Sequence, residues 1–490
     1  MAKSLSILFV TSEVFPFIRV GELGDISHSY TLAMREFGND VRVMFPKYGV
    51  ISERKNRIHE INRLRDMPIP IGNKVELATV KSSSINNPRA KVQAYITCNL
   101  CYYDQLKAVF DDPKTGKPIA ENDERFIFFC RSVIETCLIL GWFPDIIHCN
   151  DWQTSLIAAY AKVLFPNKFK RTKILLSINN FQDQGVFPEN TFDKTLLPAD
   201  VKSKFLHKNK FNFLKGGIEY ADFITTHSPA YLQEILQSST YSNSLNKNLM
   251  EKESKALGLN IGVDQWVWKP NHDNDIKQKF ETDFFSYKVT NKKELLNKFG
   301  LEYGDEPLIG MVSNLTESSG ISIFLEAIPK ILSQDLKIVM IADGDNEIKN
   351  KLKKVAKDYP TKFALKIGLD NATLHQIFAG SDIFLIPSKY ESNGWKALTS
   401  LSYGTVPVAR ATGANLEFIK DYLSDKSNGS GFLFNDFKPD SLFKSLASAL
   451  EVFKIRTEWE DLALRIMQID TSWTQSLKKY DEIYRTILKD

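Results

Sequence analysis

The 490-residue sequence is poor in three features, and each scarcity narrows the class of protein. It has no strong excess of one charge sign, because 63 Lys and Arg residues face 59 Asp and Glu residues, leaving a formal net charge of +4. So weak a bias does not indicate nucleic acid or an anionic membrane surface as the main partner. It also has no long apolar run: the most apolar later stretch, residues 126–143, contains Arg131 and Glu135, which excludes a membrane span.

Cysteine is the third scarce feature, since the chain has five and none follows Cys149. An odd number gathered in the first third does not fit a disulfide framework. Cys98 and Cys101 have the spacing of a zinc or redox pair, but no second Cys or His pair accompanies them, so we expect reduced structural thiols. The apolar run at the N-terminus is too short for a signal peptide and meets Glu13. These features predict a cytoplasmic protein.

What the chain does contain is an alternation of short apolar runs and helical patterns. Its 43% hydrophobic and 25% charged residues are ordinary globular values, which excludes a disordered chain. Runs alternating with helices are typical of a parallel sheet covered on both faces. In the first half, this pattern predicts strands at residues 5–10, 41–45, 145–149, 173–178 and 223–226.

The pattern then restarts after a polar segment near residues 239–256. The second set of predicted strands lies at residues 307–312, 337–342, 363–367, 383–387 and 405–408. The fold class is therefore α/β, with two tandem doubly wound Rossmann-like domains. Ligands of such folds bind outside the carboxyl ends of the strands, so the expected site is a cleft between the two domains. A last helix, near residues 473–488, carries apolar side chains on one face.

Several spaced motifs resemble those of the bacterial glycogen synthase and plant starch synthase glycosyltransferases. In order along the chain they read SEVFPF at residues 12–17, GELGD at 21–25, HCNDWQT at 148–154, QGVFP at 184–188, FLKGG at 213–217, GVD at 262–264, PSKYE at 387–391 and YGTVPV at 403–408. One such block is weak evidence, but this many in the same order indicate common ancestry.

The resemblance implies a GT-B glycosyltransferase that moves glucose from ADP-glucose to the non-reducing end of an α-1,4-glucan with retention of configuration. It implies an N-terminal domain at residues 1–256 on the acceptor side and a nucleotide-sugar domain at residues 257–470. The final helix, residues 471–490, is expected to pack back on the first domain. The family uses no metal ion and no other cofactor, and its partners are a sugar nucleotide and an α-glucan. Nothing in the sequence indicates an oligomeric state.

Carried over residue by residue, the resemblance gives two groups of candidate site residues. The negative charge that grows on the leaving diphosphate needs cations and backbone N–H groups, and the glucose hydroxyls need a carboxylate. The candidate catalytic residues are Glu391 and Asp151, and the candidate donor-binding residues are Arg19, Gly21, Gly24, Asn180, Gly394 and Lys396.

This chain departs from the family pattern at the residues that hold the donor. The family's diphosphate-binding Arg and Lys are replaced by Asn314 and Ser319, and a glycine of its N-terminal loop by Glu22. The family's His near the transferring glucose is Asn179. Lys396 follows Gly394 at the start of a helix, where a replacement cation could act beside the helix's positive end. These changes predict that ordinary transfer from ADP-glucose is impaired.

Simpler roles stay open for several of these residues. Glu391 could cap a helix or form a salt bridge, and Asp151 could be the N-cap of the helix that begins at Trp152. His148 could be a core histidine, and Lys396 a solvated surface lysine.

Three functions therefore remain. The chain is a divergent glycosyltransferase of this family, a catalytically inactive member that binds glucan or a partner enzyme, or a GT-B transferase that uses another donor.

Overall fold

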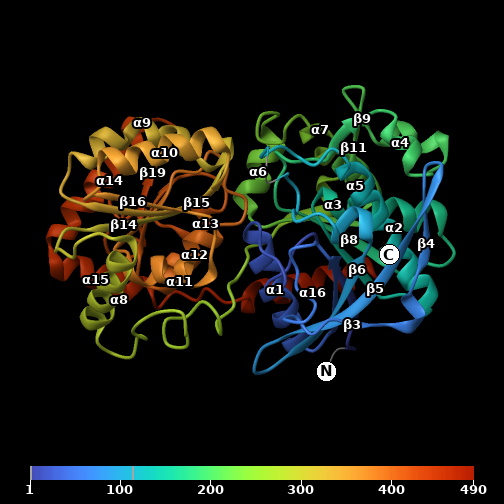
Figure 1. The fold of residues 1–490 in the computed structure, drawn as a ribbon, viewed down its shortest axis with the longest axis horizontal. Helices are drawn as coiled ribbons and strands as arrows, with labels where there is room; N and C mark the ends of the chain where they lie inside the picture. The colour runs from blue at the N-terminus through green and yellow to red at the C-terminus, as the bar shows by residue number, and fades with distance from the viewer. Residues whose placement is uncertain (1–2, 113–114, 490) are drawn as a thin grey trace. The chain divides into compact units, whose positions relative to one another are not determined.

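The computed structural model describes residues 3–112 and 115–489, and the chain divides into two compact units (Figure 1). The first unit spans Met1–Leu259 and Trp473–Asp490, and the second spans Asn260–Ser472. Each unit is a sheet covered by helices. In the part of the chain that the structure describes, no helix is both long enough and apolar enough to cross a membrane.

The sheet of the N-terminal unit has the strand order β13-β12-β8-β7-β1-β2-β6-β5-β3, with β4 paired to β5. All five strands predicted in this half are present as β1, β2, β7, β8 and β12, and each pairs in parallel with its neighbours. The strands are β1 (Ser6–Val10), β2 (Asp40–Pro46), β3 (His59–Glu60), β4 (Met67–Ile71), β5 (Lys74–Asn86), β6 (Lys91–Cys98), β7 (Ile146–Asn150), β8 (Lys173–Ile178), β12 (Phe223–Thr226) and β13 (Ala256–Gly258).

The expectation of a purely parallel sheet is wrong at one edge. β5 runs antiparallel to β6, β3 and β4, so a meander extends the parallel sheet beyond β6. β5 was missed because a run of three serines, at residues 82–84, hides the apolar alternation of a half-buried strand.

Helices cover this sheet on both faces, and a small antiparallel sheet lies at one end. The helices are α1 (Glu22–Glu36), α2 (Asn122–Leu140), α3 (Trp152–Ala159), α4 (Thr191–Lys194), α5 (Phe213–Tyr220), α6 (Pro229–Gln237), α7 (Asn246–Met250) and α16 (Thr474–Ile487). The small sheet consists of β9 (Val186–Pro188), β10 (Leu206–His207) and β11 (Lys210–Asn212).

His148 on β7 is a core histidine, as one of its two interpretations proposed. Its Nδ1 lies 2.6 Å from the Tyr484 hydroxyl on α16, and its Nε2 lies 2.6 Å from the Ser177 hydroxyl on β8. Burial lowers the pKa of His148 well below its ordinary value, so the ring is neutral and both nitrogens are used structurally. The last helix is thereby joined to the N-terminal sheet.

The sheet of the second unit is entirely parallel, with the order β16-β15-β14-β17-β18-β19. The five strands predicted here are all present. The strands are β14 (Leu308–Leu315), β15 (Lys337–Gly344), β16 (Phe363–Ile367), β17 (Ile383–Ile386), β18 (Val406–Arg410) and β19 (Phe432–Phe434). The helices are α8 (Phe284–Phe299), α9 (Ile321–Leu332), α10 (Asn346–Asp358), α11 (Asn371–Gly380), α12 (Trp395–Ser402), α13 (Asn415–Phe418), α14 (Pro439–Lys454) and α15 (Arg456–Ile466).

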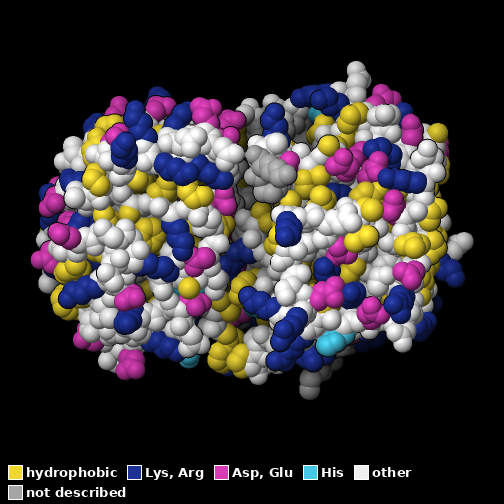
Figure 2. Space-filling view, in the orientation of Figure 1, with side chains coloured by type: hydrophobic (Ala, Val, Ile, Leu, Met, Phe, Trp, Pro, Cys, Tyr) yellow, Lys and Arg dark blue, Asp and Glu magenta, His cyan; other side chains and the backbone are white. Residues whose placement is uncertain are grey.

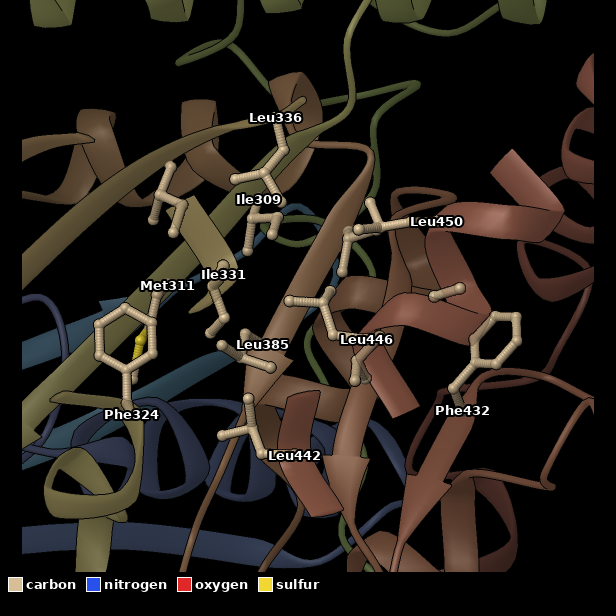
Figure 3. Close-up of a cluster of buried hydrophobic side chains, with 14 of the residues drawn as sticks. Ile309, Met311, Phe324, Ile331, Leu336, Leu385, Phe432, Leu442, Leu446 and Leu450 are labelled. Carbon is tan, nitrogen blue, oxygen red and sulfur yellow. The ribbon is translucent and has the colours of Figure 1, made fainter. Parts of the chain in front are cut away.

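The core of the second unit lies between its sheet and the helices α9 and α14 (Figure 3). Met311 of β14 and Leu385 of β17 lie among Phe324 of α9 and Leu446 of α14, and all four are fully or almost fully buried. Burial of each such side chain contributes about 1.5–3 kcal/mol. This core holds β14 and β17 in place, and the segments that follow them carry Asn314 to Gly320 and Glu391.

Candidate functional site

The loop between β1 and α1 is held by the carboxylate of Glu13. Its Oε2 accepts hydrogen bonds from the backbone N–H groups of Val20 and Gly21, the latter over 3.0 Å. Burial raises the pKa of Glu13 to about 8, the two N–H bonds lower it, and the charges of Asp25 and Glu22 add to the rise. The N–H groups just before α1 therefore already have a carboxyl oxygen of this chain as their acceptor.

Arg19, a candidate donor-binding residue, forms an ion pair with Asp25 in the first turn of α1. Its guanidinium also lies 4.7 Å from the centre of the Phe15 ring. Both charged side chains are mostly buried, with 13% and 5% of their area exposed. The pair fixes Arg19 and compensates the charge that Arg19 itself carries.

The two candidate glycines of this loop serve different ends. A Cβ at Gly24 would lie 3.2 Å from both Glu13 Oε2 and the Ile18 carbonyl oxygen, so the close approach of the loop to α1 favours a glycine, and a larger residue would push the loop outward by a few tenths of an ångström. Gly21 is the N-cap of α1 with φ −136°, an extended backbone that any residue adopts. Gly24 thus has a packing reason for its identity.

Asp151 lies between β7 and α3 and organises the segment after β8. Its Oδ1 accepts from the N–H groups of Asn179, over 2.6 Å, and Asn180, over 3.3 Å, and its Oδ2 accepts from the Asn179 side-chain amide over 3.1 Å. Asp151 is the N-cap residue of α3, as the alternative interpretation had it, but its side chain makes no capping bond to the helix. The structure therefore brings Asp151 and Asn180 together.

The backbone and charge of Asp151 are both unusual. Its φ of 56° with ψ of −173° is a conformation that non-glycine residues adopt at a cost of about 1–3 kcal/mol, typically where a side chain must be aimed. The surrounding protein raises its pKa to about 7, and the nearby Asp183 carboxylate adds to the rise. A strained carboxyl group with a perturbed pKa is the profile of a functional side chain.

Glu391 and Gly394 meet in the turn between β17 and α12. One oxygen of Glu391 accepts from the Ser388 hydroxyl over 2.9 Å and the other from the Gly394 N–H over 3.2 Å. Glu391 is 6% exposed. Gly394 has φ 67°, and a Cβ there would lie 2.5 Å from the Phe418 ring, so only glycine fits. The interpretation of Glu391 as a helix cap explains the hydrogen bond of one carboxylate oxygen, because that oxygen accepts from Gly394, the N-cap of α12.

Lys389, in the same turn, pairs with a residue of the segment after β14. Its Nζ lies 2.5 Å from Oε1 of Glu317, and its backbone N–H donates to the Ser318 carbonyl over 2.8 Å. Glu317 and Ser318 stand between Asn314 and Ser319, the residues that replace the family's Arg and Lys. The segment from residue 314 to 320 therefore contributes a carboxylate to this region, and no cation.

Two other cations lie on the same edge of the second sheet. Arg410, at the end of β18, donates to the carbonyls of Lys389, over 2.7 Å, and Asn435, over 3.2 Å. Lys396 is the second residue of α12 and is partly exposed. Arg410 thus supports the turn that carries Lys389.

Ser388 and Glu317 were not among the predicted site residues. Ser388 had a detectable signal, because it lies three residues before Glu391 in the PSKYE motif. Glu317 had none, since its pairing with Lys389 joins residues that are 72 positions apart. The site residues occur in three groups in the described chain: Glu13 with the α1 loop, Asp151 with Asn179 and Asn180, and Glu391 with Gly394.

Comparison with known proteins identifies both halves of the chain. Residues 6–251 match the family model described as the starch synthase catalytic domain, and residues 292–463 match glycosyl transferases group 1. The glycogen synthases of Chlorobaculum parvum and Chlorobaculum tepidum are each 35% identical over 489 residues, covering 99% of both chains.

Solved structures show the same fold. The catalytic domain of starch synthase IV from Arabidopsis thaliana, bound to ADP and acarbose, has a TM-score of 0.91 with 24% identity over the whole of both chains. A sucrose-phosphate synthase from Thermosynechococcus elongatus has a TM-score of 0.61 with 14% identity over 99% of both chains. The fold that this chain shares with the Arabidopsis starch synthase domain is the GT-B glycosyltransferase fold.

Proposed function

The chain belongs to the glycogen and starch synthase family of glycosyltransferases, and we propose that it is a divergent member whose transfer of glucose from ADP-glucose to an α-1,4-glucan is impaired. The observation that carries this proposal is the pairing of two of the remaining cations with the chain's own carboxylates. Arg19 pairs with Asp25, and Lys389 pairs with Glu317.

The chemistry makes this loss costly. The bond between glucose and the diphosphate breaks through an oxocarbenium-like transition state, so negative charge grows on the leaving group. Removing one preorganised donor to such a charge costs about 10²–10³ in rate. Asn314 and Ser319 together then cost about 10⁴–10⁶ if their effects are independent.

The candidate residues of each unit are given the following proposed roles in glucose transfer. Glu391 and Asp151 hold glucose hydroxyls, and Gly394 admits the donor to the N-terminus of α12. In this proposal the N-terminal unit takes the glucan and the second unit takes the nucleotide. The Arabidopsis structure with ADP and acarbose bound supports these ligand classes.

Two alternatives have support of their own. A catalytically inactive glucan-binding member is favoured by Glu22 and Asp25, which place two acidic residues in the first turn of α1, where an anion would otherwise bind. A transferase with another donor is favoured by Lys396, a cation in the first turn of α12.

A titration separates the three. Purified protein is titrated calorimetrically with ADP-glucose, other sugar nucleotides and glycogen. The proposal expects saturable binding of glycogen and weak binding of ADP-glucose. Glycogen binding without any nucleotide binding supports the inactive member, and tighter binding of another sugar nucleotide supports the altered donor. Tight ADP-glucose binding with turnover typical of a synthase contradicts the proposal.

A further inference from the structure

A groove of about 960 Å³ on the N-terminal unit is lined by side chains of one predominant charge. Its charged lining consists of Arg35, Arg42, Lys55, Arg57 and Lys91, with Asp40 as the carboxylate. The excess of four positive charges equals the formal net charge of the whole chain. In Figure 2, Lys and Arg side chains gather at the lower end of this unit, over the region where Figure 1 labels α1 and β3.

The floor of the groove is one face of the sheet where the parallel and antiparallel parts meet. On three adjacent strands, Arg42 of β2 pairs with Gln93 of β6, and Gln93 pairs with Ser84 of β5. Lys91 lies two residues from Gln93, so its side chain leaves the sheet on the same face. Val92 between them faces the opposite way and is buried. Ser82 and Ser84 of β5 lie on the same face as Gln93, so polar side chains of the three strands form a continuous hydrophilic surface.

Three of the five cations are not neutralised. Lys55, Arg57 and Lys91 are exposed, and none of them has an ion-pair partner within residues 3–112 and 115–489. Arg35 and Arg42, in contrast, share Asp40 at 2.8 and 3.6 Å. Uncompensated like charges around one concavity raise its positive potential and attract anions.

Arg42 is held in a fixed orientation. Its guanidinium lies 4.0 Å from the centre of the Trp142 ring and donates to the Tyr95 hydroxyl over 2.9 Å. Stacking and a hydrogen bond together reduce the side-chain freedom that ligand binding would otherwise cost. The groove thus combines one preorganised cation with three uncompensated ones.

The uncharged lining identifies the ligand class. The hydroxyls of Ser82 and Ser84 and the amides of Asn86 and Gln93 supply hydrogen-bonding groups for hydroxyls and phosphate oxygens, whereas the Ser83 hydroxyl already donates to the Asn56 carbonyl over 2.6 Å. The rings in the described part of the lining are those of Phe17, which is 7% exposed, and His59, which is exposed, so the groove has no row of aromatic platforms along which successive bases would stack. We infer that the groove binds a phosphorylated sugar, either free or as phosphate esters on a glucan.

This site is separate from the groups proposed to act in transfer, but it adjoins one of them. Pro16 and Phe17 form part of its wall and belong to the same loop as Arg19. The inference goes beyond the proposed function and does not depend on whether the chain transfers glucose.

The test is a calorimetric titration of the full chain with fructose 1,6-bisphosphate, with fructose as the uncharged probe. We expect saturable binding of the bisphosphate, weakened by salt, and none of fructose. The variant Lys55→Gln, Arg57→Gln, Lys91→Gln should raise the Kd about tenfold or more, since each exposed cation contributes modestly. The matched control Lys353→Gln, Lys354→Gln, Lys357→Gln changes three exposed lysines of α10 and should leave the Kd unchanged.

Phosphorylated amylopectin and unphosphorylated glycogen distinguish the two sources of phosphate. If the wild-type chain retains the phosphorylated polymer and the triple variant does not, the ligand is a phosphoglucan. If only the free bisphosphate binds, the ligand is a small phosphorylated metabolite. An unchanged Kd in the triple variant, equal loss in the α10 control, or the absence of both saturable bisphosphate binding and retention of the phosphorylated polymer overturns the inference. Tighter binding of a short single-stranded RNA than of the bisphosphate also overturns it, in favour of nucleic acid.

Discussion

The ammonium of Lys389 lies 2.5 Å from the carboxylate of Glu317. The pair joins the turn after β17 to the segment after β14, the two segments of the second unit that carry Glu391 and the replaced residues Asn314 and Ser319. Glu317 raises the pKa of Lys389, and Lys389 lowers the pKa of Glu317, so both groups are charged at neutral pH. The charge of Lys389 is thereby already compensated within the chain.

Releasing Lys389 should strengthen nucleotide binding. In Glu317→Gln the ammonium loses its carboxylate partner and becomes available to an anion, so we expect ADP to bind up to about fivefold more tightly, the range of an exposed ion pair. Calorimetry with ADP measures this change. The double variant Glu317→Gln, Lys389→Gln should lose the gain. Equal or weaker ADP binding by Glu317→Gln would show that Lys389 does not face the nucleotide.

The carboxyl group of Glu13 should make the stability of the N-terminal unit depend on pH. Its pKa is about 8 in the folded chain, against an ordinary value of 4.5, so the folded state binds its proton more tightly than the unfolded state does. Its contribution is therefore fully present below pH 4.5 and is lost as the pH rises towards 8. The loss is on the order of a few kcal/mol.

Glu13→Gln isolates this effect, because a glutamine does not ionise and its oxygen still accepts from the N–H groups of Val20 and Gly21. Urea denaturation of both proteins is compared at pH 5 and pH 8. The wild-type chain should lose stability relative to the variant between these two values. Parallel pH dependences would mean that Glu13 titrates normally.

Two tyrosines of α16 should differ sharply in their contribution to stability. The hydroxyl of Tyr484 lies 2.6 Å from Nδ1 of His148, so Tyr484→Phe leaves a buried ring nitrogen unsatisfied and should cost about 1–3 kcal/mol. The hydroxyl of Tyr480 is also buried, but the groups beside it, the hydroxyls of Ser177 and Thr225, already bond each other over 2.5 Å. Tyr480→Phe should therefore be nearly neutral. Thermal unfolding of both variants measures the contrast, and equal losses would refute the role given to His148.

Gly320 should tolerate substitution by alanine less well than Gly368, although both have a left-handed backbone. Gly320 has φ 74°, and a Cβ there would lie 1.9 Å from the Pro387 carbonyl oxygen, whereas Gly368 has φ 89° and nothing within 4 Å. Both alanine variants pay for the left-handed backbone, but only Gly320→Ala adds a collision with the turn that carries Glu391. We expect it to be about 1–3 kcal/mol less stable than Gly368→Ala. Similar melting temperatures would contradict the close approach.

The parallel strands could be predicted from the sequence and the antiparallel edge could not. β14 and β17 read as continuous apolar runs because both faces of the sheet are covered. β5 has one solvated face, which carries Ser82 and Ser84, and its pairing with β6 is set by tertiary contacts that no local pattern encodes. The same solvated face forms the basic groove.

The candidate site was predictable as motifs but not as contacts. The motif residues of Asp151 and Glu391 follow strands β7 and β17, as the carboxyl-end rule for α/β sheets requires. Their partners depend on geometry: Asp151 holds the backbone of residues 179 and 180, and Lys389 pairs with a residue in another segment. Sequence spacing cannot reveal an ion pair formed across two loops.

The most direct test of impaired transfer is the initial rate of incorporation of radiolabelled glucose from ADP-glucose into glycogen. The wild-type chain is compared with one variant that carries Arg19→Lys, Glu22→Gly, Asn179→His, Asn314→Arg and Ser319→Lys. The account predicts a very low wild-type rate that rises by about 10² or more in the variant, as donors to the developing charge return. A wild-type rate equal to or above that of the variant, in a variant that remains folded, would contradict it.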